Sequence, residues 1–250
     1  MPEFAEFGGQ YTQFLTLGLE ARYDTRMGRI ARVVAPGLPH HVTQRGNRRM
    51  ETFFGDEDYA EYLKLLAQWC GRFEVVVWAY CLMPNHVHLV AVPETAHGLS
   101  HALGEAHRRY TRCVNFREGW RGHLWQERFA SFVMDEQHLL AALRYVELNP
   151  VRAGLVACPG DYRWRSARAH LEGKDDLLVR VEPMLSYIGD WSAYLVLDVD
   201  EAEAEAAALR LHGRTGRPLG SADFIAGLET SLGRFLRKRR PGPRSKRKIN

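Results

Sequence analysis

The stretch that decides the fold is residues 73–92, FEVVVWAYCLMPNHVHLVAV. Two apolar runs rich in valine and aromatic residues flank the turn-forming pair Pro84 and Asn85, which predicts a β-hairpin. In the second run, His86 and His88 lie two positions apart. Because side chains alternate between the two faces of a strand, both imidazoles project from the same face. Two imidazoles so placed are a natural pair of metal ligands, although such a pair also occurs as ordinary polar surface.

Outward from the hairpin, the sequence predicts alternating strands and helices. Strands are expected at 38–46 and 124–134, and helices after Asp56, at 99–116 and from Asp135 to about 149. Read in order, this is strand, helix, strand, strand, helix, strand and an additional helix. The order predicts an α+β fold with a ferredoxin-like antiparallel sheet and helices on one face. Such a sheet leaves its other face free for a ligand.

Composition places the chain among ordinary globular proteins. Its 250 residues are 46% hydrophobic and 26% charged, enough for one domain with appendages. No run approaches the ~20 apolar residues of a membrane span, and the first residues lack the pattern of a secretory signal. A cytoplasmic protein is therefore expected. The four cysteines are single in the sequence, which predicts reduced, buried thiols.

Positive charge is concentrated at the end of the chain. Residues 233–250 carry nine basic side chains and no acid, which leaves 25 bases against 30 acids in residues 1–232. A proline-containing basic run cannot bury apolar surface, so it is expected to be mobile and to bind a polyanion, unless it is only a solvated tail. We divide the chain into an N-terminal extension (1–26), a main domain (27–190), a helical extension (191–232) and this tail (233–250). The tail residues expected to contact this polyanion are Arg237, Lys238, Arg239 and Arg240.

The helix predicted from Asp135 has two distinct faces. An apolar stripe is formed by Leu139, Leu143 and Val146. A second face holds residues spaced four, three and four apart, namely His138, Ala142, Tyr145 and Asn149. The small Ala142 leaves room there, so Tyr145 would present its phenol beside a metal held by His86 and His88, with the Asn149 carbonyl oxygen as third ligand. The plainer alternatives are a half-buried tyrosine and an asparagine that ends the helix.

Three segments together resemble a known family. LMPNHVHLV at 82–90, RYVELNPVRAGLV at 144–156 and DYRWRSARAH at 161–170 are similar to the single-tyrosine HUH transposases, and specifically to the REP-associated tyrosine transposases. HUH denotes histidine, hydrophobic residue, histidine. The similarity covers about residues 29–170, and TGRPLGSADF at 215–224 is also similar to the ends of such proteins. His86 and His88 match the HUH pair, Tyr145 matches the nucleophile and Asn149 its polar partner.

The resemblance implies a DNA transposase that cleaves single-stranded DNA beside a hairpin such as a REP element. Tyrosine attacks the scissile phosphate, forms a 5′-phosphotyrosine link and frees a 3′-hydroxyl. A phenol with a pKa near ~10 is a modest nucleophile at neutral pH, so a divalent ion, Mg²⁺ or Mn²⁺, is expected to assist. The covalent link conserves the phosphodiester bond energy, so no ATP is expected. The protein is expected to act as a monomer or homodimer, with Tyr145 working within one chain or between two.

Two groups of side chains are candidates for contacting the DNA. The loop after the first strand offers Arg45, Asn47, Arg48 and Arg49, and the second helix offers Arg108, Arg109 and Arg112. Trp125 and Phe129 are candidate stacking platforms for unpaired bases, although aromatic residues in a strand are more often core. The last predicted helix has apolar residues at helical spacing and is expected to dock on the body, namely through Phe224, Leu228, Leu232 and Phe235.

Several alternatives remain at this point. Tyr110 lies among arginines and is a second candidate nucleophile, although packing is the better interpretation. His41 and Thr43 spell the H-x-T of two-histidine phosphoesterases, but no second such motif follows in register. Glu147 is a second candidate ligand, but two residues of helix turn it about 200° away from Tyr145. Two other functions stay open: a regulator that binds structured DNA repeats without cutting them, and a hydrolytic nuclease or phosphoesterase.

Overall fold

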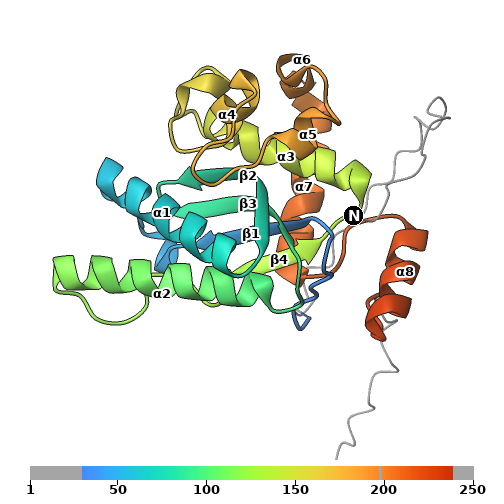
Figure 1. Ribbon diagram of the computed structural model, residues 1–250, viewed down its shortest axis with the longest axis horizontal. Helices are drawn as coiled ribbons and strands as arrows, with labels where there is room; N and C mark the ends of the chain where they lie inside the picture. The colour runs from blue at the N-terminus through green and yellow to red at the C-terminus, as the bar shows by residue number, and fades with distance from the viewer. Residues whose placement is uncertain (1–29, 197–198, 239–250) are drawn as a thin grey trace, which may run out of the picture.

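The computed structural model describes residues 30–196 and 199–238, with the backbone alone for 199–202. At its centre is a four-stranded antiparallel sheet in the order β2-β3-β1-β4, drawn in the middle of Figure 1. The strands are β1 (His40–Arg45), β2 (Val75–Met83), β3 (His86–Pro93) and β4 (Ala130–Val133). The predicted hairpin is formed by β2 and β3. This strand order, with a helix after β1 and another after β3, confirms the ferredoxin-like α+β fold.

Two long helices cover one face of the sheet. They are α1 (Asp56–Arg72) and α2 (Gly98–Glu118), which contact each other; in Figure 1, α1 lies on the left at the height of the strands and α2 runs below it. Their apolar residues recur at helical spacing and pack against the strand residues that point to this face, among them Val42, Val87 and Leu89. The 124–134 segment is less regular than predicted, because only Ala130–Val133 forms a strand and Glu127 has a left-handed backbone with φ 55°. Trp125 and Phe129 are buried in this core, so they do not provide stacking platforms.

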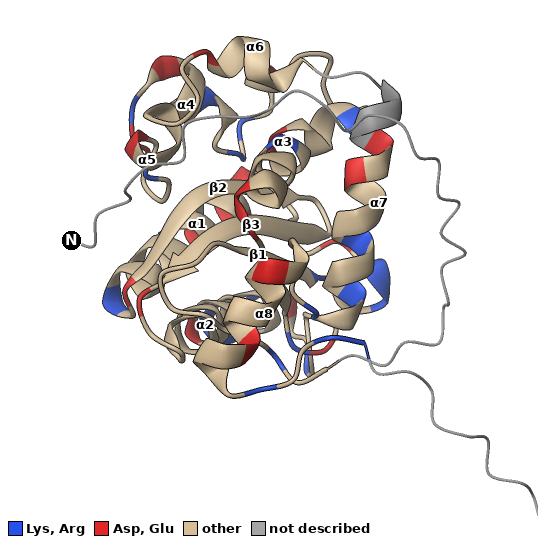
Figure 2. Ribbon diagram, turned by 90° about the vertical axis from the view of Figure 1, so that its right-hand side faces the viewer, with Lys and Arg blue, Asp and Glu red and all other residues tan. Residues whose placement is uncertain are grey.

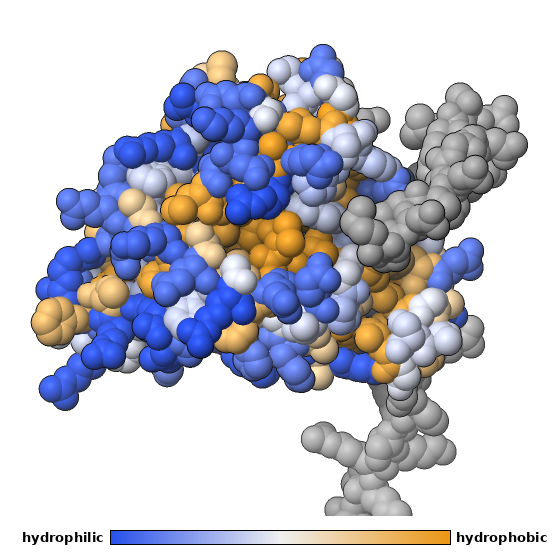
Figure 3. Space-filling model, in the orientation of Figure 1, coloured by the Kyte–Doolittle hydropathy of each residue, from blue (hydrophilic) through white to orange (hydrophobic). Residues whose placement is uncertain are grey.

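Helices also lie on the opposite face, which the sequence left free. They are α3 (Glu136–Arg152) and α7 (Val199–Thr215), which contact each other and both contact the sheet. The predicted stripe of α3 is buried against strand residues that include Val90 and Phe132, and Leu209 of α7 joins the same core. The apolar stripe of α3 is stable only when it is removed from water, so α3 packs on this face and covers it. Figure 3 shows apolar residues in the middle of the view, framed by hydrophilic side chains.

The helix α3 begins where predicted and ends later. The Asp135 side chain caps it by accepting a hydrogen bond from the backbone N–H of His138. The helix does not stop at Asn149 but continues through Pro150 to Arg152. A proline near the end of a helix removes one hydrogen bond without preventing one further turn.

Shorter elements complete the described chain. They are the 3-10 turns η1 (Asn47–Arg49) and η2 (Pro159–Asp161) and the helices α4 (Ala167–Glu172), α5 (Glu182–Leu185), α6 (Trp191–Leu195) and α8 (Ala222–Leu232). Leu228 of α8 is buried with Val33 and Val133, while Phe224 and Leu232 are partly buried, so α8 docks on the body. Phe235 lies beyond the end of α8 and is 56% exposed.

Some predictions fall outside the described residues or need correction. The N-terminal extension 1–26 and the tail residues Arg239 and Arg240 are not described. Cys70 and Cys81 are buried as free thiols, but Cys113 and Cys158 are exposed, so burial was wrong for these two. In the described part of the chain, none of the helices is both long and apolar enough to cross a membrane.

Candidate active site

A cleft opens where β1 and β3 meet α3 and α7. Its volume is about 520 Å³. It is lined by His41, Thr43, Gln44, Arg45, Arg49, His86, His88, Tyr145, Ala207, Leu209, Arg210, Leu211, Gly213 and Arg214. The two histidines of the HVH motif and the helical tyrosine therefore converge on one cleft within a single chain.

The strand pairing explains how the histidines reach this cleft. On β3, His86 pairs with Arg45 of β1, and His88 pairs with Thr43. Paired residues of neighbouring antiparallel strands point to the same face, so β1 and β3 present alternate residues to the cleft. The ring centroids of His86 and His88 are 4.9 Å apart. The predicted arrangement of the pair on one face is confirmed.

Each of the two imidazoles has its Nδ1 engaged. The Nδ1 of His86 lies 2.6 Å from the Asn85 side-chain oxygen, and the Nδ1 of His88 lies 3.1 Å from the Nε2 of His41. Among the described residues, no hydrogen bond takes up the Nε2 of either ring. A partner on one ring nitrogen fixes the orientation of a histidine and leaves the other nitrogen for a ligand. His41, which was expected to lie near the site, thus helps to fix the orientation of the His88 ring.

Burial keeps both rings neutral at physiological pH. It lowers the pKa of His86 to about 4, and the nearby Arg45 guanidinium acts in the same direction. Burial also holds the pKa of His88 well below its ordinary value, assisted by the imidazoles of His86 and His41. A neutral imidazole has a free lone pair, so both rings are in the form that binds metal.

The two rings fit a divalent cation with an incomplete set of protein ligands. They provide two neutral imidazole nitrogens whose rings are held in place from the other side. Within the described ranges, no three His, Cys, Asp or Glu side chains are placed to hold a metal ion together. The remaining ligands of an ion here would be oxygens of water, of an amide or of a bound phosphate, which Mg²⁺ and Mn²⁺ accept.

Tyr145 faces the histidines from α3. Its ring centroid is 5.4 Å from that of His88 and 6.0 Å from that of His41, in edge-on arrangements. Ala142, one turn earlier, is fully buried against the sheet and lets the helix approach closely. The guanidinium carbon of Arg152 lies 5.6 Å from the centroid of the tyrosine ring. The tyrosine ring thus lies beside His88 and His41, near a cation, and lines the same cleft as His86.

The structure does not bring Asn149 to the cleft with the other three residues. It lies one turn beyond Tyr145 and is not among the residues that line the cleft. Its side-chain nitrogen is buried and has no hydrogen-bond partner among the described residues. Because α3 continues past this position, the amide is part of a helical turn and not of an open helix end. Its role as a third ligand stays a prediction.

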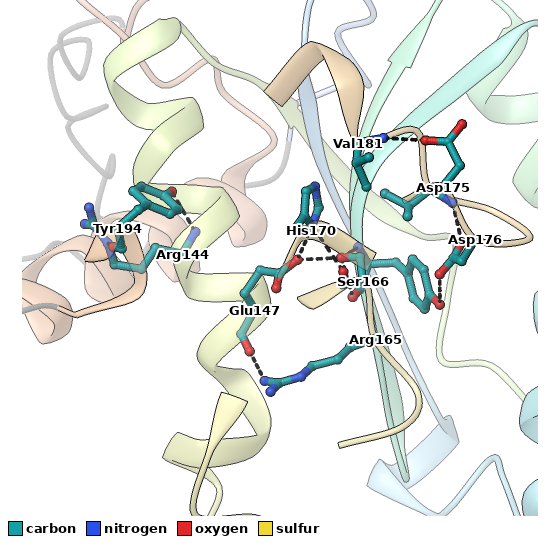
Figure 4. Close-up of polar contacts among 11 residues, drawn as sticks. Arg144, Glu147, Arg165, Ser166, His170, Asp175, Asp176, Val181 and Tyr194 are labelled. Atoms are coloured by element: carbon teal, nitrogen blue, oxygen red, sulfur yellow. Dashed lines mark hydrogen bonds and ion pairs between the residues drawn. The ribbon is translucent and has the colours of Figure 1, made fainter. Parts of the chain in front are cut away.

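Glu147 belongs to a separate buried cluster, shown in Figure 4. Its carboxyl group accepts hydrogen bonds from the Ser166 hydroxyl at 2.6 Å and the His170 Nδ1 at 3.0 Å. Its backbone carbonyl accepts a hydrogen bond from the Arg165 guanidinium. These partners come from the DYRWRSARAH segment, so the cluster fixes α3 against the chain that follows it. Glu147 lies on another side of the helix from Tyr145, as its spacing predicted, and does not reach the cleft.

The predicted basic loop is divided between two depressions. Arg45 and Arg49 line the histidine cleft. Asn47 lines a neighbouring depression of about 790 Å³, together with Ile30, Ala31, Arg32, His123, Trp125, Glu127 and Arg128. Arg48 and Arg49 both adopt left-handed backbone conformations, with φ of 54° and 63°. Such conformations turn the chain sharply and expose the side chains of this loop.

The arginines of α2 do not join the cleft, because α2 covers the opposite face of the sheet. Arg108 and Arg109 both pair with Glu105 of the same helix, and Arg109 also lies over the Trp69 ring. Arg112 lines a shallow depression of α2 with Arg108. Tyr110 is fully buried and donates a hydrogen bond to the Thr52 carbonyl at 2.6 Å, which agrees with its interpretation as a packing residue.

Basic residues of the C-terminal part have two different positions. Arg237 pairs with Glu229 of α8, and Lys238 is exposed at the end of the described chain. Arg210 and Arg214 of α7 line the histidine cleft, and sequence analysis missed them. Their four-residue spacing on a predicted helix was the available signal. Figure 2 shows acidic residues at the upper end of α7 and basic residues near its lower end.

A ferredoxin-like sheet that presents a His-Val-His strand to a helical tyrosine is the arrangement expected of the single-tyrosine HUH class. Residues 36–149 match the family described as IS200-like transposases. The matched segment contains His86, His88 and Tyr145. The family predicted from the sequence is thus confirmed.

The chain was also compared with solved structures. A REP-associated tyrosine transposase bound to a REP hairpin is 19% identical, with 60% of this chain and 90% of that chain covered and a TM-score of 0.51. This likeness shows the fold. A transposase candidate from Deinococcus radiodurans R1 is 21% identical over 48% of this chain and 95% of that chain, with a TM-score of only 0.35. No curated protein matches the sequence.

Proposed function

We propose that the chain is a REP-associated type of transposase that cleaves and rejoins hairpin-bearing single-stranded DNA through Tyr145. The observation that carries the proposal is the convergence of Tyr145, His86 and His88 on one cleft. The match of residues 36–149 to the IS200-like family supports a transposase, and the related structure was solved with a REP hairpin. A palindromic, REP-like hairpin is therefore the substrate that we propose for this chain.

The proposed reaction is a transesterification. The Tyr145 oxygen bonds to the scissile phosphorus while the bond from phosphorus to the 3′ oxygen breaks. The phenol loses its proton, the departing 3′ oxygen gains one, and the products are a 5′-phosphotyrosine and a free 3′-hydroxyl. One ester replaces another, so rejoining needs no nucleoside triphosphate.

The chain's own residues prepare this step. His86 and His88 would hold Mg²⁺ or Mn²⁺, which when bound neutralises phosphate charge. Asn85 and His41 fix the orientation of these two rings. Packing of α3 against the sheet holds Tyr145 beside them, which favours attack in a fixed geometry. Arg45 and Arg49 provide positive charge on the same cleft, suited to the phosphates on either side of the scissile one.

The proposal also assigns the reaction to a single chain, because the tyrosine and the histidines meet without a partner subunit. Mixing the Tyr145→Phe and His88→Ala variants tests this assignment. If each active site lies within one chain, the mixture stays as inactive as either variant alone. Recovery of activity in the mixture would place Tyr145 in the site of a second subunit.

The main test is a search for a covalent protein–DNA adduct. The full chain is incubated with Mn²⁺ and a panel of labelled single-stranded hairpins with varied flanking sequences, then denatured and separated on a gel. The proposal predicts an adduct that survives denaturation and is lost in Tyr145→Phe. Tyr187→Phe is the matched control, because this tyrosine is 51% exposed and lies outside the cleft. Cleavage without an adduct would indicate a hydrolytic nuclease, and hairpin binding without cleavage would indicate a regulator.

A further inference from the structure

The helix α7 forms one wall of the candidate active site, although it lies outside the segment that matches the family. The family match ends at residue 149, whereas α7 spans Val199–Thr215. Six α7 residues line the cleft, including Arg210 and Arg214. These two arginines are one helical turn apart, so they lie on the same side of the helix. The C-terminal extension thus contributes directly to the site.

The charge of the cleft indicates what it binds. Four arginines line it, Arg45 and Arg49 from the sheet side and Arg210 and Arg214 from α7, and its lining contains no carboxylate. Guanidinium groups on two walls suit a ligand that carries several phosphates along its length. A nucleic-acid strand that passes between the sheet and α7 has this property, and a single small anion would use only one wall.

Contacts with α3 hold α7 in place. Arg144 pairs with Glu205 at 3.1 Å, and Arg152 pairs with Glu203 at 2.6 Å. Leu209 is buried, and the Thr215 carbonyl accepts a hydrogen bond from the backbone N–H of Ile30. The helix is therefore fixed to the same element that carries Tyr145, and its arginines keep a defined position relative to the phenol.

The two arginines differ in their present partners. Arg210 pairs with Glu203, which already binds Arg152. In the described chain, no carboxylate partner is found for Arg214, which is exposed. A phosphate that binds Arg210 must therefore compete with Glu203, whereas one that binds Arg214 meets a free guanidinium group. The loss of Arg214 is expected to weaken binding more than the loss of Arg210.

From these observations we infer that Arg210 and Arg214 bind backbone phosphates of the DNA strand next to the scissile phosphate. The inference rests on the proposed function, because it takes the cleft to be the site of strand cleavage. It assigns a DNA-contacting role to α7 that the family segment alone does not contain. These are binding residues, and Tyr145 remains the nucleophile.

The test compares DNA binding by four variants of the full chain at a series of salt concentrations. They are Arg210→Ala, Arg214→Ala, the double variant and the control Arg168→Ala, whose exposed arginine pairs with Glu172 on α4, away from the cleft. Labelled single-stranded hairpins are used without divalent ions, so that binding is measured without cleavage. We expect the loss of Arg214 to lower affinity about tenfold, and the loss of Arg210, which competes with Glu203, to lower it less. The double variant should also lower the slope of log affinity against log salt by about 1.4.

Two further measurements keep the outcome clear. Thermal melting checks that each variant is folded. A further variant, Arg214→Lys, keeps the positive charge and should therefore show the salt slope of the wild type, in contrast to Arg214→Ala. Wild-type affinity and slope in the folded double variant would overturn the inference. If the wild type forms an adduct but the double variant binds normally, the inference fails and the proposed function stands. If the wild type forms no adduct, the proposed function fails, and the salt slopes still decide whether α7 contacts DNA.

Discussion

The buried cluster around Glu147 leads to a quantitative prediction for Ser166→Ala. Ser166 is fully buried, and its hydroxyl donates to the Glu147 carboxyl at 2.6 Å while accepting from the Tyr80 backbone N–H at 2.9 Å. The substitution leaves two buried polar groups without this partner, at about 1–3 kcal/mol each. Allowing for partial relaxation, we expect a loss of about 2–4 kcal/mol in the free energy of unfolding. In a chain of this size, 3 kcal/mol lowers Tm by roughly 6–12 °C.

Urea unfolding followed by circular dichroism measures this loss. The matched control is Ser100→Ala, whose hydroxyl bonds the His97 carbonyl at the exposed first turn of α2. That change should cost less than about 0.5 kcal/mol. Equal stabilities for the two variants would show that the Glu147 cluster does not hold α3 in place, and the reasoning about this cluster would be refuted.

Three further predictions follow. The double variant His86→Ala, His88→Ala should abolish adduct formation but change hairpin affinity less than about threefold, because phosphate contacts come mainly from arginine and lysine; strong adduct formation would contradict the assignment of the ligands. Burial lowers the pKa of His40 to about 4 and that of His107 to about 3. Below pH 6.5 the unfolded chain therefore binds a proton on each of these two rings, whereas the folded chain does not. As the pH falls from 7 to 5, each of the two histidines lowers the free energy of unfolding by about 2 kcal/mol. Urea unfolding at the two pH values tests this, and equal stability would contradict it. Truncation after Lys238 removes six bases and should lower the salt slope of DNA binding by up to about 4; an unchanged slope would show that the tail does not contact DNA.

The sequence predicts the sheet and the main site because these depend on local patterns. Alternation and the Pro84-Asn85 turn define the hairpin, and a two-residue spacing on a strand places His86 and His88 on one face. The helical spacing of α3 separates Tyr145 from the buried stripe, so the tyrosine could be assigned to the side that meets the histidines.

The remaining parts of the site depend on how elements pack, which local patterns do not specify. Helical spacing predicts which side of α3 carries Asn149. It does not predict whether that turn of the helix lies over the histidine cleft or beyond it. The charge of Arg108 predicts exposure, but not which face of the sheet α2 covers. Arg210 and Arg214 reach the cleft only because α7 packs on α3, through ion pairs between residues about 50 to 60 positions apart in the chain. The four-residue spacing of the two arginines places them on one side of α7, but it does not specify which elements that side meets.

The central claim is that the oxygen of Tyr145 carries the cleaved strand, and peptide mapping of the adduct tests it most directly. Trypsin cuts after Arg144 and Arg152 and releases YVELNPVR, in which Tyr145 is the one hydroxyl-bearing side chain. After nuclease trimming of the DNA, mass spectrometry should find this peptide with a nucleotide attached through phosphate. A nucleotide on the peptide of any other tyrosine, with YVELNPVR unmodified, would contradict the account.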